Sequence, residues 1–355
     1  MKILGIETSC DDTAAAVIEA NGGFSKPRFS VLSNTSYSQV AIHKKFGGIV
    51  PNLASRAHLE KIIPTIKETL RVAKTKPDKI DLIAVTRGPG LMPSLLIGVN
   101  TARALAYAWK KPILGVNHIE GHIFSNWLTN KKIEFPALIL IVSGGHTELV
   151  LMRDYGKYKI IGQTLDDAAG ECFDKTARLL ELGFPGGPAI AASAAMANKL
   201  PITNYKLQVQ LPRPMINSKD YNFSFSGLKT AVLYLYNDLN TDLNTDLNTD
   251  LNTDALAAEI QSAIIDVLAV KTIKAVENFN PKTVMICGGV SANKKLREEM
   301  AEKIRPYKIP LFVPDFAYTT DNAAMISAAG YFNYLVKKPV RNSWKKIEAN
   351  ANLKL

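Results

Sequence analysis

Two histidines four positions apart, His118 and His122, are the residues of this chain with the clearest capacity for chemistry. In a helix, this spacing places both imidazoles on one face, where they can bind one transition-metal ion. Zinc proteases carry a glutamate directly beside one such histidine, but Glu120 lies between the two, about 200° around a helix from His118. The spacing therefore favours a metal site without protease geometry. It equally allows two histidines that cap a strand-to-helix junction.

Acidic side chains form a second group with catalytic capacity, because they gather at predicted turns and helix starts. Carboxylates in such places can bind metal ions or move protons, and they can also simply cap helices. Capping suits Asp166 and Asp321 in particular, since each precedes a predicted helix. The group comprises Asp11, Asp12, Asp166, Asp167, Glu171, Asp174 and Asp321.

Three glycine-rich turns occur in the second half of the chain: SGGH at 143–146, PGGP at 185–188 and GGVSAN at 288–293. Glycine lets backbone amides approach an anion closely, and a helix that starts at such a turn adds the positive end of its dipole. Together the turns favour a nucleotide ligand, and Lys175 is either a phosphate contact or a surface lysine. The absence of a P-loop, and of G-x-G-x-x-G after the first strand, argues against a Walker ATPase or a Rossmann dehydrogenase.

The elements that must position these residues follow one order twice. Hydrophobic patterning in each half predicts three leading strands and then alternating helices and strands, although the second half contains a long irregular stretch before a helix at about 255–279. We therefore predict a duplicated α/β fold with an N-terminal domain at 1–132 and a C-terminal domain at 133–355, around a ligand-binding cleft. The last helix is expected to return toward the N-terminal domain.

A repeat of Asp-Leu-Asn-Thr occupies residues 238–254. Asn, Asp and Thr are poor helix formers, and a leucine at every fourth position drifts around a helix. We predict an expanded surface loop between two helices.

Composition limits the classes of protein that this chain can represent. The 355 residues are 47% hydrophobic, enough for two cores, and they contain no apolar run that could span a membrane. Three scattered cysteines argue against a disulfide framework and fit a reducing cytoplasm. The formal net charge of +11 suits a polyanionic partner such as RNA, although many basic enzymes bind no nucleic acid.

Taken together, these segments resemble the bacterial TsaD family of tRNA N6-adenosine threonylcarbamoyltransferases, formerly labelled O-sialoglycoprotein endopeptidases. The matching segments keep the family order from residue 3 to about residue 330. They read ILGIETSCDDTAAAV, GGIVPNLASRAHLEKI, TRGPGL, NHIEGH, VSGGHTEL, LDDAAGECFDK, FPGGP, FSFSGLKTA, CGGVSAN and TTDNAAM. The resemblance implies the ASKHA fold of actin, hexokinase and the heat-shock ATPases, with two RNase H-like domains around a central cleft.

The resemblance also implies the site. It implies one divalent metal ion held by His118, His122 and Asp321, with iron(II) as the first candidate and zinc as the second, and it places Asp321 across the cleft from the histidines. It implies that Asp11 lies near the reacting carbonyl. The adenylate part of the substrate is expected against Ile141, Val142, Ser143, Gly144, Gly145, Asp174, Gly187 and Asn293. Ala191 departs from the acidic residue that is common after the PGGP turn, which removes one expected ribose contact.

The implied reaction transfers a threonylcarbamoyl group from threonylcarbamoyl-AMP to N6 of the adenosine just 3′ of the anticodon (position 37) in tRNAs that read ANN codons, with release of AMP. Asp11 or Asp12 would orient the amine or accept its proton. Expected partners are tRNA, a smaller ASKHA paralogue (TsaB-like) and a P-loop ATPase (TsaE-like), all in the cytoplasm. The rival hypotheses are a zinc metallopeptidase, a non-catalytic ATP-binding scaffold of the same fold, and a kinase-like enzyme.

Overall fold

The computed structural model describes residues 1–197, 210–241, 249–340 and 342–355. Its contacts divide the chain into two compact units, which we treat one at a time. Unit 1 comprises Met1–Glu134, Asp154–Tyr158 and Val313–Leu355, and unit 2 comprises Phe135–Arg153 and Lys159–Phe312. Val313–Leu355 therefore groups with the N-terminal residues. A division into consecutive domains at residue 132 remains a prediction.

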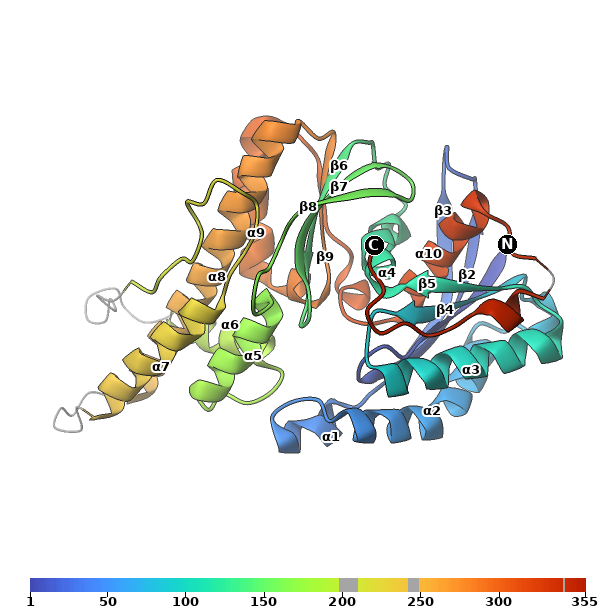
Figure 1. Cartoon of the computed structure of the whole chain (residues 1–355), viewed down its shortest axis with the longest axis horizontal. Helices are drawn as coiled ribbons and strands as arrows, with labels where there is room; N and C mark the ends of the chain where they lie inside the picture. Colours follow the sequence, from blue (N-terminus) through green and yellow to red (C-terminus); the bar gives the residue numbers. More distant parts are fainter. Residues whose placement is uncertain (198–209, 242–248, 341) are drawn as a thin grey trace. The chain divides into compact units, whose positions relative to one another are not determined.

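Unit 1 is built on a five-stranded mixed sheet with the strand order β3-β2-β1-β4-β5. Figure 1 labels β2, β3, β4 and β5 of this sheet. The first three strands form antiparallel pairs, and β4 and β5 continue the sheet in parallel with β1. The strands are β1 (Lys2–Glu7), β2 (Asp12–Asn21), β3 (Arg28–Ser38), β4 (Leu82–Gly88) and β5 (Ile113–Asn117). The helices are α1 (Val40–His43), α2 (Pro51–Val72), α3 (Met92–Trp109), α4 (His118–Phe124) and α10 (Ala323–Val336).

The two faces of this sheet carry different helices because strand residues alternate between the faces. Leu4 and Ile6 of β1 join the apolar core that includes Ile62 of α2 and Val99 of α3. Helix α10 covers the opposite face, where a Cβ at Gly5 would lie 2.3 Å from the carbonyl oxygen of Ala323. Glycine in β1 therefore lets α10 approach the sheet closely, and this brings the start of α10 to the carboxyl end of β1.

Unit 2 repeats this arrangement. Its sheet has the order β10-β9-β6-β7-β8, which is the order of unit 1 read from its other edge, with β6 to β10 in place of β1 to β5. The strands are β6 (Ala137–Val142), β7 (Thr147–Asp154), β8 (Lys157–Gln163), β9 (Thr283–Cys287) and β10 (Leu311–Phe312). The helices are α5 (Ala169–Leu179), α6 (Gly186–Ala197), α7 (Ser226–Thr241), α8 (Thr249–Phe279) and α9 (Lys294–Ile304). The predicted duplicated α/β fold is confirmed.

One prediction about unit 2 was wrong, and a second was wrong at the ends of its range. The segment expected to be irregular contains α6 and α7, and the last three residues of the PGGP turn are the first residues of α6. Both ends of the Asp-Leu-Asn-Thr repeat are helical, since α7 ends at Thr241 and α8 begins at Thr249, while residues 242–248 lie outside the described part. Extending an existing helix costs less free energy than starting one, so poor helix formers are tolerated at the ends of α7 and α8.

No helix in the described ranges is both long enough and apolar enough to cross a membrane.

Candidate metal centre and nucleotide-type turns

Helix α4 presents both histidines, and Asn117 fixes where this helix begins. The side-chain oxygen of Asn117 accepts hydrogen bonds from the backbone N–H groups of Ile119 (2.8 Å) and Glu120 (3.4 Å), as an N-cap does. The cap is thus Asn117, and the alternative in which the histidines cap the junction is wrong. His118 and His122 are 8% and 1% exposed and lie on one face, as their spacing predicts.

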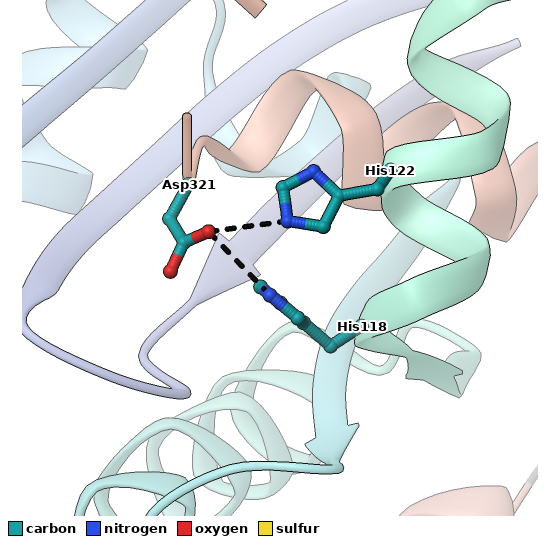
Figure 2. A group of neighbouring side chains, drawn as sticks. All are labelled: His118, His122 and Asp321. Atoms are coloured by element: carbon teal, nitrogen blue, oxygen red, sulfur yellow. Dashed lines mark ion pairs between the residues drawn. The ribbon is translucent and has the colours of Figure 1, made fainter. Parts of the chain in front are cut away.

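Asp321 supplies the third side chain, from the residue pair that precedes α10. The cap of α10 is Asn322, whose side chain accepts a hydrogen bond from the backbone N–H of Met325, so the expectation that Asp321 caps this helix was wrong. The Asp321 Oδ1 atom lies 3.4 Å from Nε2 of His118 and 3.3 Å from Nε2 of His122 (Figure 2). All three residues belong to unit 1, which corrects the expectation that Asp321 faces the histidines from the other domain.

These three side chains fit a divalent metal ion. One ligand atom from each lies within 4.8 Å of the other two. Bonds of about 2.1 Å to one ion at tetrahedral or octahedral angles would put neighbouring ligand atoms about 3.0–3.4 Å apart, which matches both measured distances. Asp321 is the polar neighbour of Nε2 of the buried His122, at 3.3 Å, while Nδ1 of this ring makes no hydrogen bond with a described residue. Two imidazoles and one carboxylate are ligands that iron(II) and zinc both accept.

The electrostatics of the group also favour a cation. Burial alone would raise the pKa of Asp321, but His118 and His122 hold it well below its usual range. Burial alone would lower the pKa of His118, but the charges of Asp321 and Glu7 raise it well above its usual value. Burial and the neighbouring His118 lower the pKa of His122. The acidic neighbours thus favour a positive charge at His118, and a metal ion bound there would supply that charge in place of a proton.

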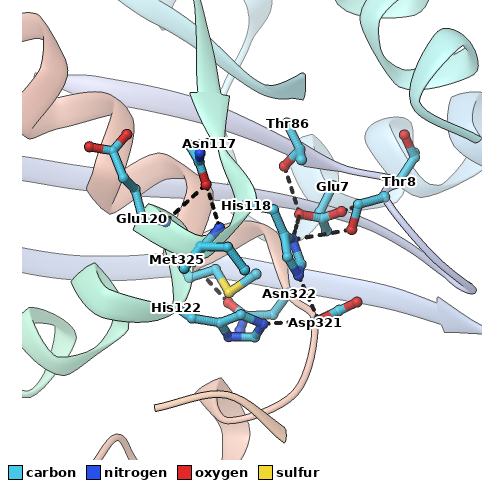
Figure 3. Close-up of polar contacts among 12 residues, drawn as sticks. Glu7, Thr8, Thr86, Asn117, His118, Glu120, His122, Asp321, Asn322 and Met325 are labelled. Atoms are coloured by element: carbon cyan, nitrogen blue, oxygen red, sulfur yellow. Dashed lines mark hydrogen bonds and ion pairs between the residues drawn. The ribbon is translucent and has the colours of Figure 1, made fainter. Parts of the chain in front are cut away.

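Glu7, which was not among the residues expected at the site, lies next to the ring of His118 (Figure 3). It ends strand β1, is 1% exposed, and places Oε2 3.0 Å from the Nδ1 atom of His118. The hydroxyl of Thr86 donates to the same oxygen over 2.6 Å, and the backbone N–H of Ser9 donates to the other oxygen over 2.5 Å. A charged residue directly after the uncharged run at 3–6 was the available signal in the sequence.

Glu120 points away from the histidines, as Figure 3 shows, and has partners of its own. The hydroxyl of Tyr158 donates to Oε1 over 3.1 Å, and the side-chain amide of Asn333 donates to Oε2 over 3.2 Å. Glu120 thus links α4 to Tyr158 and to α10, all within unit 1, and is not a base at the metal centre. This geometry argues against the metallopeptidase hypothesis.

Asp11 ends the turn between β1 and β2, and Asp12 begins β2, in the same unit as the histidines. Burial, together with the negative charges of Asp321 and Asp11, raises the pKa of Asp12 to about 7. Burial and Asp321 also raise the pKa of Asp11. The buried Oδ1 atom of Asp12 makes no hydrogen bond with a described residue. Burial raises the pKa of Cys10 well above its usual value, so this thiol is not a nucleophile near neutral pH.

Unit 2 brings the SGGH turn, the start of α5 and the turn after β9 to one end of its sheet. A Cβ at Gly170 would lie 2.5 Å from the carbonyl oxygen of Ser143, and a Cβ at Gly288 would lie 2.4 Å from that of Val142. Among the described residues, nothing lies within 4 Å of the position that a Cβ would take at Gly144, Gly145, Gly187 or Gly289. Open space over glycine backbone is what a closely bound anion requires.

The residues expected to contact adenylate differ in which of their groups are available for hydrogen bonding. Ile141 and Val142 are fully buried in β6, so only their backbone could face a ligand. The amide of Ser143 donates to the carbonyl of His146 over 2.8 Å, which leaves the amides of Gly144 and Gly145 as the donors of this turn without a partner in the described part.

Asp174 and Gly187 are brought together, since Oδ1 of Asp174 accepts a hydrogen bond from the backbone N–H of Gly186 over 2.7 Å. Asn293 caps α9 by accepting from the N–H of Leu296, and its side-chain amide donates to Gln261 over 2.8 Å.

Two acidic residues of unit 2 have structural partners. Asp166 does not cap α5, which begins at Ala169. It accepts hydrogen bonds from the hydroxyls of Ser224 and Ser226, each over 2.6 Å, and so holds the start of α7. Asp167 pairs with Lys175 over 2.7 Å, and Glu171 pairs with the same lysine over 3.0 Å. These ion pairs favour the structural interpretation of Lys175.

Comparisons with known proteins point to one family. A family model described as "TsaD: tRNA N6-adenosine threonylcarbamoyltransferase" matches residues 30–328. A protein of that name from Caldicellulosiruptor saccharolyticus is 48% identical over 335 residues, covering 94% of this chain and 94% of its own length. Another from Bacillus subtilis is 45% identical and covers 97% of this chain and 93% of its own length.

Among solved structures, HypF from T. kodakarensis aligns over 97% of this chain and 49% of its own length, with a TM-score of 0.58 and 12% sequence identity. A likeness at this level of identity concerns the fold alone.

Proposed function

This chain belongs to the tRNA N6-adenosine threonylcarbamoyltransferase family, and we propose that its donor substrate is threonylcarbamoyl-AMP. It is an acyltransferase that modifies adenosine in tRNA at N6. We place the acceptor just 3′ of the anticodon, at position 37 of tRNAs that read ANN codons. The anticodon loop is single-stranded, so this base can be presented without opening a duplex. The N6 amine attacks the carbamoyl carbon, the bond to the phosphate oxygen breaks, AMP leaves and N6 loses a proton.

His118, His122 and Asp321 would hold the metal ion, iron(II) first and zinc second. When bound, the ion supplies Lewis-acid activation and a fixed point for substrate oxygens. The observation that carries this proposal is that ligand atoms of two buried histidines and one carboxylate all lie within 4.8 Å of one another. The Asp321 side chain is 22% exposed, so the centre is open to solvent on that side.

Asp12 is the stronger of the two candidates for the general base. A base works best when its pKa lies near the working pH, and the pKa of Asp12 is raised to about 7. Asp11 would orient the amine. In unit 2, the amides of Gly144 and Gly145 would bind the phosphate of the adenylate and stabilise developing negative charge. Asp174, Gly187 and Asn293 would surround its nucleoside, and the backbone of Ile141, Val142 and Ser143 would border it.

The partners follow from this reaction. The net charge of +11 favours binding of tRNA phosphates, with an affinity that falls as salt rises. We further propose that the chain works in the cytoplasm with a smaller ASKHA paralogue and a P-loop ATPase.

A transfer assay with threonylcarbamoyl-AMP and an ANN-reading tRNA tests the proposal. His118→Ala, His122→Ala and Asp321→Ala should each lose at least about 100-fold in rate while remaining folded, because each removes a ligand. Glu120→Gln is the matched control on the same helix and should keep its activity. Full transfer by all three ligand variants would refute the metalloenzyme, whereas no transfer by the wild type would favour the scaffold hypothesis.

A further inference from the structure

We propose that Glu7 is a positioning residue that keeps a proton on Nδ1 of His118 and so directs the Nε2 lone pair of that ring toward the metal ion. This inference rests on the proposed metal centre and adds a residue that stands behind it. A histidine ligand must present an unprotonated nitrogen, and the hydrogen bond made by its other nitrogen decides which one that is.

The contacts of Glu7 leave its carboxylate little freedom to move. Its two oxygens take up the backbone N–H of Ser9, the hydroxyl of Thr86 and the ring nitrogen of His118, over 2.5, 2.6 and 3.0 Å respectively. An ionised carboxylate can only accept hydrogen bonds, so the Nδ1 atom that faces it must carry the hydrogen. The hydroxyl of Ser9 lies 3.1 Å from the same nitrogen and can share that hydrogen.

An amide cannot replace this carboxylate. In Glu7→Gln, one end of the side chain becomes an N–H₂ donor. If that end faces His118, Nδ1 must accept, and the hydrogen moves to the nitrogen that should bind metal. If the side chain turns over, the N–H₂ group meets the backbone N–H of Ser9, and two donors oppose each other at a buried position. Either orientation disturbs the ring of His118 or its support.

The competing explanation is that Glu7 only joins β1, β4 and α4 as a buried structural acid. Glu120 provides the comparison, because it lies on the metal-binding helix and accepts two side-chain hydrogen bonds without touching a ligand. A purely structural role predicts that Glu7→Gln and Glu120→Gln lose stability alike, with no selective change at the metal centre.

The test is zinc affinity, measured by competition with a chromophoric chelator on the metal-free full-length protein. Glu7→Gln should bind zinc about 10- to 100-fold more weakly than the wild type, while Glu120→Gln should stay within twofold. Far-UV circular dichroism checks that both variants are folded. Equal affinities for Glu7→Gln and the wild type would overturn the proposal even if His122→Ala abolishes binding, whereas failure of the wild type to bind zinc would overturn the metal centre and this inference together.

A second measurement needs no Glu7 variant. Histidine-selective ¹⁵N labelling of the zinc-loaded wild type gives only five imidazoles to resolve, and His118→Ala identifies the signals of His118. Long-range ¹H–¹⁵N correlations should show a protonated Nδ1 and a zinc-bound Nε2 in that ring. Zinc on Nδ1, or a proton on Nε2, would overturn the proposal.

Discussion

Two carboxylates of unit 1 show how neighbours set the chemistry of a residue. His118 and His122 hold the pKa of Asp321 well below its usual range, so this side chain is an anion ready to bind a cation. The charge of Asp321, added to burial, raises the pKa of Asp12 to about 7. The two surroundings thus move the pKa values of these acids in opposite directions. The lowered pKa suits a metal ligand, and the raised pKa suits a candidate base.

Asp12→Asn should therefore change how stability depends on pH in the metal-free protein. Folded Asp12 keeps its proton up to about pH 7, whereas the unfolded chain releases it near pH 4, so this residue lowers stability as pH rises between those values. The variant should gain on the order of 1–3 kcal/mol over the wild type on going from pH 4 to pH 8. Urea unfolding at both pH values measures this, and a constant difference between the proteins would contradict the raised pKa.

Helix α4 is the element on which the metal centre depends, and it is short. Its start is fixed by Asn117, whose side-chain amide also donates to the carbonyl of Lys354 over 3.1 Å. The same C-terminal segment donates from the backbone N–H of Asn350 to the carbonyl of Arg87 over 2.7 Å. The last residues of the chain thus support the helix that carries both histidines.

Asn117→Ala should cost unit 1 about 1–2 kcal/mol, because α4 loses its cap. Asn117→Ser is the matched control, since a serine hydroxyl can still cap the helix but is too short to donate to Lys354, and it should cost about half as much. All three tryptophans, Trp109, Trp127 and Trp344, lie in unit 1, so their fluorescence in urea follows this unit selectively. Equal losses in the two variants would show that the cap contributes nothing.

At the scale of the whole molecule, the metal centre joins distant parts of one chain. Its ligands come from α4 and from the residue before α10, about 200 positions apart, and both belong to unit 1. A metal ion that binds only the folded state adds its binding free energy to the stability of that state. Metal should therefore stabilise the unit to which all three ligands belong.

Zinc at about 100 times its dissociation constant should raise the free energy of unfolding of unit 1 by about 2.7 kcal/mol. The increase should be visible in the tryptophan fluorescence transition and should disappear on addition of a chelator. His122→Ala serves as the control and should show no zinc-dependent shift. An equal shift in that variant would mean that zinc binds elsewhere.

The amino-acid sequence by itself determined the features that depend on neighbours along the chain. Short apolar runs located the strands of both units, and four-residue spacing put His118 and His122 on one helix face. Local rules failed at helix starts, where Asn117 and Asn322 are the caps while Asp321 is left free to face the histidines. They also missed α6 and α7, whose first turns contain glycine.

Only the tertiary structure decided the contacts between residues far apart in sequence. It placed Asp321 in the same unit as the histidines, Glu7 and Thr86 behind His118, and Tyr158 and Asn333 on Glu120. Local spacing cannot specify these pairs, because they arise where the sheet brings β1, β4 and α4 together and where α10 packs over the glycine of β1. The sequence thus determined which side chains could bind a metal ion, and the packing decided which of them meet and in which charge state.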